Sequence, residues 1–191
     1  MTKKRKAPSH SKKASARPTT RSAKKVLDQG DIISLILKDH APLKKLIKIM
    51  KSSEKDLSER QEAFEQFCPL LVSHAKAEEQ ALYAHIKNEE ELRSEALEGD
   101  VEHGLADQMV EEALRTDDED LWSARVKVLA ELVEHHIEEE EEDLLPEFRK
   151  NSNHELRKEL GEEYLATKAN INANGSEKNP SRNPVEKTAS L

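Results

Sequence analysis

Hydrophobic positions in the early part of this chain recur at the spacing of an α-helix. From Asp31 onward they form a stripe made of Ile33, Ile36, His40, Leu43, Ile47 and Met50. Residues separated alternately by three and four positions lie on one face of a helix. The stripe therefore predicts an amphipathic helix with a histidine, His40, within its apolar face. Pro42 falls inside this helix and is expected to bend it beside His40.

Three further stretches repeat this pattern, each with a histidine in its stripe. The stripes are Phe64, Phe67, Leu71, His74, Glu78 and Leu82; then His103, Asp107, Val110 and Leu114; then Leu129, Leu132, His136, Glu140 and Leu144. The third helix is expected to begin near Asp100, and the fourth to be capped by Thr116 or Asp117. A fifth, moderately amphipathic helix is expected from Ser152 to about Ile171.

Composition agrees with a helical chain. Of the 191 residues, 37% are charged and 3% are aromatic, a balance that suits one modest helical domain rather than a β-sandwich or a two-domain enzyme. We expect an all-α domain over residues 29–171. Disordered tails are expected over residues 1–28 and 172–191, because their polar, proline-containing sequences leave little to bury.

Charge is divided unevenly between the N-terminal tail and the remainder of the chain. Residues 1–25 hold ten Lys and Arg and no acid, whereas residues 26–191 carry 21 basic against 39 acidic residues, a net charge of −18. The sequence contains neither a membrane-spanning apolar run nor the apolar segment of a secretory signal, and Cys68 has no partner for an internal disulfide. These features predict a soluble, cytoplasmic protein.

A histidine and a glutamate four residues apart occur twice in the sequence. His74 and Glu78 lie in the stretch HAKAEEQALYA, and His136 and Glu140 lie in HIEEEEEDLLP. On a helix this spacing projects both side chains from one face. Two such units are what a carboxylate-bridged pair of metal ions requires, provided that other helices supply two more imidazoles.

Four of the eight histidines occupy core positions on four different helices. A lone histidine on an apolar face is more often a hydrogen-bonded core residue than a ligand, so a metal-free structural bundle is the simplest alternative. Burial of four imidazoles and two carboxylates without a cation, however, leaves charges or donors unpaired at a cost of several kcal/mol each. The metal-binding interpretation is therefore favoured.

Other polar residues near these motifs are weaker candidates. In the acidic run Glu138–Glu142, only Glu140 shares the face of His136, and Glu141 and Asp143 are secondary possibilities. Two histidines point away from their stripes and are expected at the surface, namely His85 and His135.

The order of these motifs resembles a known family. Asp39-His40, His74-x-x-x-Glu78, Glu102-His103 and His136-x-x-x-Glu140 followed by Leu-Leu-Pro are similar to the hemerythrin HHE cation-binding domain. The resemblance covers about residues 31–168. It implies an up-and-down four-helix bundle, here with an additional C-terminal helix, around a non-haem di-iron centre. The ligands that it implies for the two iron ions are His40, His74, Glu78, His103, His136 and Glu140.

The predicted donors suit iron. If both glutamates bridge and each ion takes two imidazoles, each ion receives four protein donors, and an oxo or hydroxo bridge leaves one position open. Imidazole and carboxylate together suit iron or manganese and over-supply a four-coordinate zinc ion. The His-x-x-x-Glu spacing also differs from the Glu-x-x-His of ferritin-like di-iron bundles.

Two positions depart from the oxygen-carrying branch of that family. Asp107 stands where carriers have a second histidine on the third helix, and Glu140 stands in place of an aspartate five residues after its histidine. The resulting four-His, two-Glu set is more similar to bacterial iron–sulfur repair proteins, although their cysteine-bearing N-terminal domain has no counterpart here. Asp107 and Glu141 are expected either to coordinate the metal or to orient a ligand imidazole.

These features predict a module that binds O₂ or NO at a di-iron centre or senses redox state or iron status. A redox enzyme or an iron donor, acting in NO or peroxide reduction or in iron–sulfur repair, is the alternative. The sensing module is favoured because the sequence shows no dedicated acid–base pair, substrate pocket or reductase domain.

The basic segment of residues 1–25 generates a prediction. We expect it to bind nucleic acid or another polyanion without sequence preference, with an affinity that falls steeply as salt rises. Removal of residues 1–25 should therefore abolish the binding of duplex DNA at low salt in an anisotropy titration. An unchanged affinity after removal would leave the segment as a solubilising extension that contacts its own acidic domain.

Overall fold

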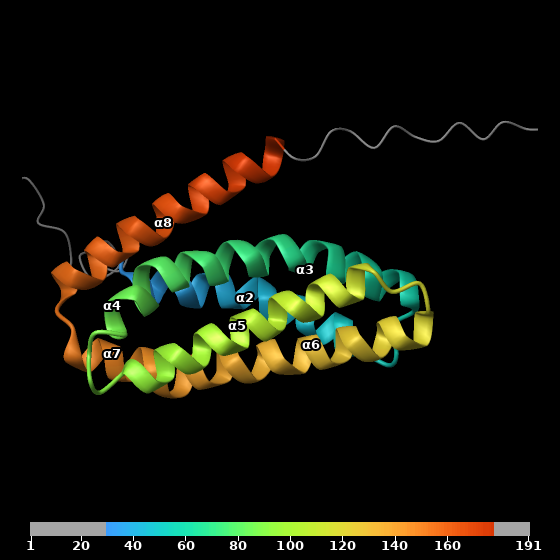
Figure 1. The fold of residues 1–191 in the computed structure, drawn as a ribbon, viewed down its shortest axis with the longest axis horizontal. Helices are drawn as coiled ribbons and strands as arrows, with labels where there is room; N and C mark the ends of the chain where they lie inside the picture. Colours follow the sequence, from blue (N-terminus) through green and yellow to red (C-terminus); the bar gives the residue numbers. More distant parts are fainter. Residues whose placement is uncertain (1–29, 178–191) are drawn as a thin grey trace, which may run out of the picture.

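The computed structural model describes residues 30–177, and these residues form helices without any β-strand. Four long helices make the bundle: α2 (Ile32–Lys51), α3 (Leu57–Glu78), α5 (Arg93–Leu114) and α6 (Glu119–Glu139). They alternate in direction, and α2 packs between α3 and α6, as Figure 1 shows. The predicted all-α, up-and-down bundle with an additional C-terminal helix is confirmed. The tail predicted over residues 1–28 lies outside the described residues. Of the tail predicted over residues 172–191, residues 172–177 instead continue the last helix, and residues 178–191 lie outside the described residues.

Short elements continue two of the long helices. The π-helix η1 (Glu79–Tyr83) and the short helix α4 (Ala84–Ile86) follow α3 directly. In the same way η2 (Glu140–Leu144) and α7 (Leu145–Asn151) follow α6. The two copies of the His-x-x-x-Glu motif thus both run into a π-helical turn, a feature that is frequent at functional sites.

Side-chain caps define where three of the long helices begin. Asp31 caps α2 by accepting from the amide of Ile33 at 3.0 Å, and Asp56 forms a capping box with Glu59 at the start of α3. Asp118 caps α6 by accepting from the amide of Leu121 at 2.8 Å. The cap of α6 therefore lies one or two residues later than the sequence predicted.

Helix α5 begins at Arg93, about two turns before the predicted start near Asp100. Gly99 lies inside this helix and is buried there. A Cβ at this position would lie 2.5 Å from the Tyr83 hydroxyl. Gly99 therefore reads as a helix boundary in the sequence, but its lack of a side chain instead allows the Tyr83 ring to approach α5 closely.

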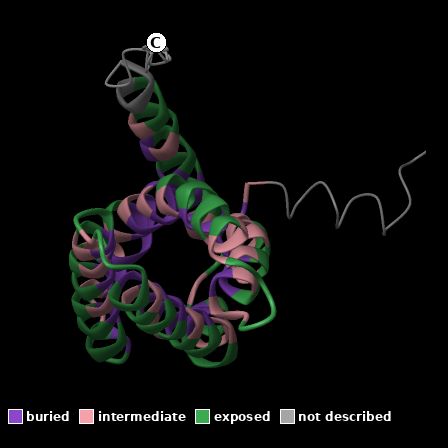
Figure 2. Cartoon of the chain, turned by 90° about the vertical axis from the view of Figure 1, so that its right-hand side faces the viewer, coloured by how far each residue is buried: buried purple, intermediate pink, exposed green. Residues whose placement is uncertain are grey.

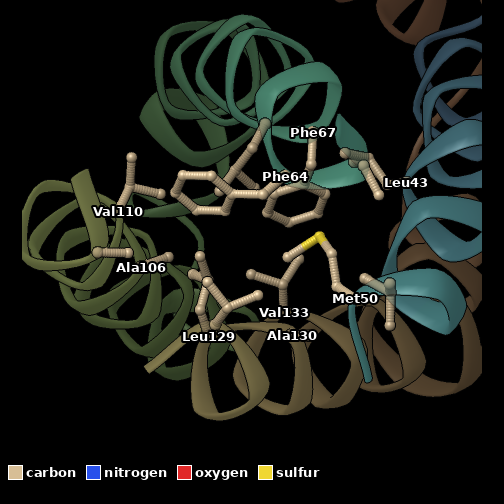
Figure 3. Packing of buried hydrophobic residues seen from close by; sticks show 14 of the residues in the cluster. Leu43, Met50, Phe64, Phe67, Ala106, Val110, Leu129, Ala130 and Val133 are labelled. Carbon is tan, nitrogen blue, oxygen red and sulfur yellow. The ribbon is translucent and has the colours of Figure 1, made fainter. Parts of the chain in front are cut away.

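Two apolar clusters fill the bundle, one towards each end. The first includes Leu43, Met50, Phe64, Phe67, Val110, Leu129 and Val133, whose side chains converge in Figure 3. The second includes Ile32, Ile36, Leu82, Tyr83, Leu144, Phe148 and Tyr164. Seen along the bundle in Figure 2, the buried residues face the inside of the ring of helices. Full burial of each such aliphatic or aromatic side chain contributes about 1.5–3 kcal/mol.

Helix α8 (His154–Glu177) extends past Ile171, the predicted end of the fifth helix. It packs against α2, α3 and η1. Arg157 pairs with the buried carboxylate of Asp31 at 2.8 Å, and Thr167 donates to Gln80 at 3.0 Å. Among residues 30–177, no helix is long and apolar enough to cross a membrane.

The close approach of α8 to the start of α2 generates a stability prediction. A Cβ on the buried Gly161 would collide with the carbonyl oxygen of Gly30 and would approach the amide of Ile32. These are backbone atoms that cannot move independently, so we expect Gly161→Ala to lower the free energy of unfolding by about 1–3 kcal/mol. Urea denaturation measures this change.

Gly104→Ala is the matched control for that variant. Gly104 is exposed inside α5, and a Cβ there would have no atom within 4 Å. Alanine should therefore stabilise this helix by roughly 0.5–1 kcal/mol. Equal stabilisation by both substitutions would contradict the tight contact between α8 and Gly30.

Candidate metal centre

The six predicted donors meet in a polar layer between the two apolar clusters. They come from all four bundle helices: His40 from α2, His74 and Glu78 from α3, His103 from α5, His136 from α6 and Glu140 from the first residue of η2. Each is at most 5% exposed. The helical stripes therefore place these six side chains together in the centre of the bundle.

Glu78 lies between imidazoles of two different helices. Its Oε2 is 3.2 Å from Nε2 of His74, which is one turn away in α3, and 3.9 Å from Nε2 of His103 in α5. Neither carboxylate oxygen of Glu78 has a hydrogen-bond partner among the described residues. The carboxylate thus faces two imidazole nitrogens without forming a hydrogen bond to either.

Glu140 has an equivalent position between two other imidazoles. Its Oε2 is 3.2 Å from Nε2 of His40 and 3.7 Å from Nε2 of His136. This oxygen is also buried without a hydrogen-bond partner among the described residues. Each glutamate therefore contacts one imidazole from the α2–α3 pair and one from the α5–α6 pair, as expected of two bridging carboxylates.

The donor atoms form two overlapping groups in which all atoms lie within 4.8 Å of one another. These groups are His40, His74, Glu78 and Glu140, and then Glu78, His103 and His136. Buried polar atoms without partners cost several kcal/mol, and cations between them would remove that cost. The residues present therefore fit a pair of metal ions, with Glu78 common to both groups.

Glu141 fixes the orientation of His40. The Nδ1 of His40 lies 3.0 Å from Oε1 of Glu141, whose other oxygen accepts from Lys44 at 2.6 Å. Glu141 thus contacts the side of the ring that faces away from the donor cluster. Of the two roles expected for Glu141, the geometry agrees with orientation of an imidazole.

Tyr164 of α8 fixes the orientation of His74. Its hydroxyl lies 3.0 Å from Nδ1 of His74 and donates to Asp39 at 2.6 Å. Since the hydroxyl proton is committed to Asp39, Nδ1 of His74 must carry the proton that it donates to the tyrosine oxygen. The Nε2 of His74 is then unprotonated and available as a donor to a metal ion.

The imidazoles of α5 and α6 also have carboxylates behind them. Nδ1 of His136 lies 2.7 Å from Oε2 of Glu102, and Nδ1 of His103 lies 3.4 Å from Oε1 of Glu79. All four rings therefore have an oxygen near Nδ1 and direct Nε2 inward. This arrangement is typical of metal-ligating histidines, because the outer oxygen fixes both tautomer and ring orientation.

Tyr83 positions Glu140. Its hydroxyl donates to Oε1 of Glu140 at 2.6 Å, and its ring stacks on His103 with centroids 5.5 Å apart. Burial and the nearby Glu140 carboxylate raise the pKa of Tyr83 well above its usual value, so the hydroxyl remains a donor at neutral pH. This hydrogen bond restrains one carboxylate oxygen of Glu140, whereas the other has no hydrogen-bond partner among the described residues.

Burial changes the ionisation of two groups in the layer. Burial and the nearby Glu140 carboxylate raise the pKa of Glu78 well above its usual value. Burial and the charge of His40 lower the pKa of His74 well below its usual value, which keeps this imidazole neutral. A cation beside these groups would stabilise the ionised carboxylate and would bind the neutral imidazole.

Asp107 lies apart from the donor cluster. Its side chain is 40% exposed, and its carboxylate lies 3.5 Å from Lys76 at the bundle surface. The buried stripe of α5 runs through Ala96, Gly99, His103, Ala106, Val110 and Ala113, which places Asp107 one residue off the inward face. The expectation that Asp107 faces inward beside His103 is wrong.

Sequence reasoning did not assign site roles to several residues that surround the donors. They are Asp39, Glu79, Tyr83, Glu102 and Tyr164. Asp39 and Glu102 directly precede the predicted donors His40 and His103 and could have been recognised from that position. Tyr164 carries the clearest missed signal, since it is the one Phe, Tyr or Trp in the stretch predicted as the fifth helix.

A cleft of about 440 Å³ opens between the first half of α5 and the segment from α6 to α7. Its lining includes Tyr83, Gly99, His136 and Glu140, so it reaches one side of the donor cluster. Nine acidic residues line the cleft together with Lys150. The cleft therefore gives small molecules or ions a polar, negatively charged approach to the centre.

The chain matches the model of a known protein family. The model of the hemerythrin HHE cation binding domain matches residues 31–148, which is more than half of the chain and includes all six predicted donors. No curated protein and no solved structure matches the chain.

The contact between Tyr164 and His74 generates a prediction about metal affinity. Tyr164→Phe keeps the buried ring but removes the oxygen that accepts from Nδ1 of His74. We expect the affinity for metal to fall about 10–100-fold, the usual effect of losing such a contact. Titration of metal-free protein with Fe²⁺ without oxygen, followed by calorimetry, measures this affinity.

Thr167→Val is the matched control, since it removes another hydroxyl from the contact surface of α8. Thr167 donates to Gln80 and contacts no predicted donor. Its replacement should leave the metal affinity unchanged. If both variants lose affinity equally, the docking of α8 matters to the centre and the tyrosine oxygen does not.

Proposed function

Because this chain belongs to the hemerythrin HHE cation-binding domain family, we propose that its buried cluster holds two iron ions and that the centre binds a small neutral ligand. The chain is thus a metal-binding protein of helical-bundle architecture. The observation that carries the proposal is the set of buried donor atoms that face one another from four helices. Among them, Nε2 of His40, Nε2 of His74 and carboxylate oxygens of Glu78 and Glu140 have no hydrogen-bond partner among the described residues.

Four imidazoles and two carboxylates would hold the ions. Glu78 and Glu140 would supply the carboxylate oxygens, because each lies between imidazoles of the two helix pairs. This mixture of nitrogen and oxygen donors suits iron or manganese better than zinc. Iron, when bound, supplies the affinity for O₂ and NO and the redox chemistry that protein side chains lack.

The surrounding residues keep the donors in place. Oxygens of Glu141, Tyr164, Glu79 and Glu102 lie behind the four imidazoles and direct Nε2 towards the cluster. Tyr83 restrains Glu140 by a hydrogen bond to one of its oxygens. This preorganisation lowers the cost of binding a metal, because the side chains are already ordered.

The charge of the cleft favours neutral ligands. Nine acidic residues near the opening of the centre repel anions such as nitrite or superoxide. Neutral diatomic molecules such as O₂ and NO are not repelled. We therefore infer a module that binds or senses O₂, NO or redox status rather than an enzyme that acts on anionic substrates.

An iron donor or di-iron redox enzyme is the second candidate. It is favoured by the direct contact of the acidic cleft with His136 and Glu140, through which an ion could be exchanged. Catalytic turnover separates the candidates. Repeated consumption of NO or peroxide in the presence of a reductant indicates an enzyme, whereas a stoichiometric spectral change on exposure to O₂ or NO indicates a binding module.

Metal content generates the main prediction. We expect purified protein to contain about two iron ions per chain and to lose stability when a chelator removes them, because metal binding contributes to folding. Free ion at a hundredfold excess over Kd stabilises by about 2.7 kcal/mol, which corresponds to roughly 5–10 °C in melting temperature for a chain of this size. Elemental analysis and calorimetry measure both quantities.

Substitution of a donor should have the same effect as chelation. His74→Ala removes a buried donor and should lower both iron content and melting temperature, whereas His85→Ala is a suitable control. His85 is about one-third exposed and pairs with Glu89 at 3.0 Å, away from the donor groups. Stoichiometric zinc without iron, after expression in iron-replete cells, would refute the di-iron proposal.

A further inference from the structure

A second group of potential metal ligands lies at the surface beside the donor cluster. Glu102, His135 and Glu139 each offer a ligand atom, and these atoms lie within 4.8 Å of one another. Nε2 of His135 is 3.3 Å from Oε1 of Glu139. His135 and Glu139 are exposed, whereas the side chain of Glu102 is only 14% exposed. The group therefore connects the surface with the interior.

Glu102 links this outer group to the candidate centre. Its Oε2 contacts Nδ1 of His136 at 2.7 Å, and His136 contributes Nε2 to the donor cluster. Glu102 and Glu139 also line the acidic cleft. An ion bound by the outer group would therefore lie one imidazole away from the buried donors.

The cleft continues from this outer group to the centre. Its acidic lining includes Glu91, Glu95, Glu98, Glu142, Asp143 and Glu147. At its inner end lies Glu140, which is 3% exposed and has one carboxylate oxygen without a hydrogen-bond partner among residues 30–177. Carboxylate side chains therefore line the cleft from the surface to the buried Oε2 of Glu140, which has no hydrogen-bond partner among residues 30–177.

We propose that this cleft is the route by which divalent metal ions enter and leave the buried centre, with a first binding position formed by Glu102, His135 and Glu139. The proposal rests on the proposed function, since it requires a metal centre at the end of the cleft. A cleft with carboxylates of one sign concentrates cations and accelerates their arrival. The imidazole of His135 adds preference for transition-metal ions over Na⁺ or K⁺.

The rate of metal uptake tests the route. Metal-free full-length protein is mixed with Co²⁺, whose visible absorbance reports coordination, in a stopped-flow instrument at low salt. The triple variant Glu98→Gln, Glu139→Gln and Glu142→Gln removes three exposed carboxylates from the cleft and leaves all six predicted donors in place. We expect uptake to slow about tenfold or more, with the same number of ions bound at the end.

A second triple variant controls for net charge. Glu111→Gln, Glu131→Gln and Glu138→Gln make the same change in charge at exposed positions that do not line the cleft. Glu138 directly precedes Glu139 in the sequence, but only Glu139 lines the cleft. The two triple variants therefore differ in whether the altered side chains line the cleft and not in the charge removed. This control should take up Co²⁺ at nearly the rate of the unmodified protein.

His135→Ala tests the first binding position separately. This change slows uptake if His135 takes part in capture, although it leaves the carboxylates intact. An unchanged rate in this variant overturns the outer binding position.

Three other results would overturn the proposal. Equal slowing of both triple variants would show an effect of overall charge, and a normal rate in the cleft triple would exclude the route. A lower final occupancy in the cleft triple would make its carboxylates part of the centre. Failure of the unmodified protein to take up either Co²⁺ or Fe²⁺ would instead refute the metal centre itself.

Discussion

Burial of six polar side chains between two apolar clusters is the constraint on which the rest of this structure depends. Imidazoles and carboxylates without partners would cost several kcal/mol each in such a place. Part of this cost is offset outside the cluster, because each histidine has an oxygen near its Nδ1. The inner nitrogens of His40 and His74 have no hydrogen-bond partner among the described residues, and those of His103 and His136 contact each other at 3.1 Å. The helices therefore supply two sets of polar groups. The inner set is the six candidate donors, and the outer set is the oxygens that lie near Nδ1 of the four histidines.

Helical periodicity was enough to predict which side chains form the inner set, the six candidate donors. His40, His74 and His136 fall at apolar positions of long stripes, and a glutamate one turn after a buried histidine stays on the same face. The outer set could not be predicted in this way. Glu141 and Glu102 lie next to donors in sequence, off the apolar stripes, and their role depends on which neighbouring helix they face.

Failures of the sequence reasoning have specific physical causes. Asp107 follows His103 by four residues, a spacing that predicts an inward side chain. Four of the six buried residues of α5 are Ala or Gly, which carry little hydrophobic signal, so the sequence pattern does not reveal the true inward face. Gly99 is a poor helix former that precedes the predicted start near Asp100, yet it lies inside α5 and accommodates the ring of Tyr83. The π-helical turns η1 and η2 have more residues per turn than the 3.6 of an α-helix. A constant period therefore cannot predict which face of the helix the residues after these turns occupy.

Tyr164 shows that the candidate site extends beyond the part of the chain that the family model matches. The family match ends at residue 148, yet the oxygen that fixes His74 comes from a helix that begins at His154. A protein cut at the family boundary would retain every donor and lose one tautomer-determining contact, together with the cover that α8 gives to α3. Relatives that share the domain but differ in their C-terminal helix can therefore hold the same ligands with a different affinity for metal. The segment after the domain is thus a place where evolution can adjust the centre without changing its ligands.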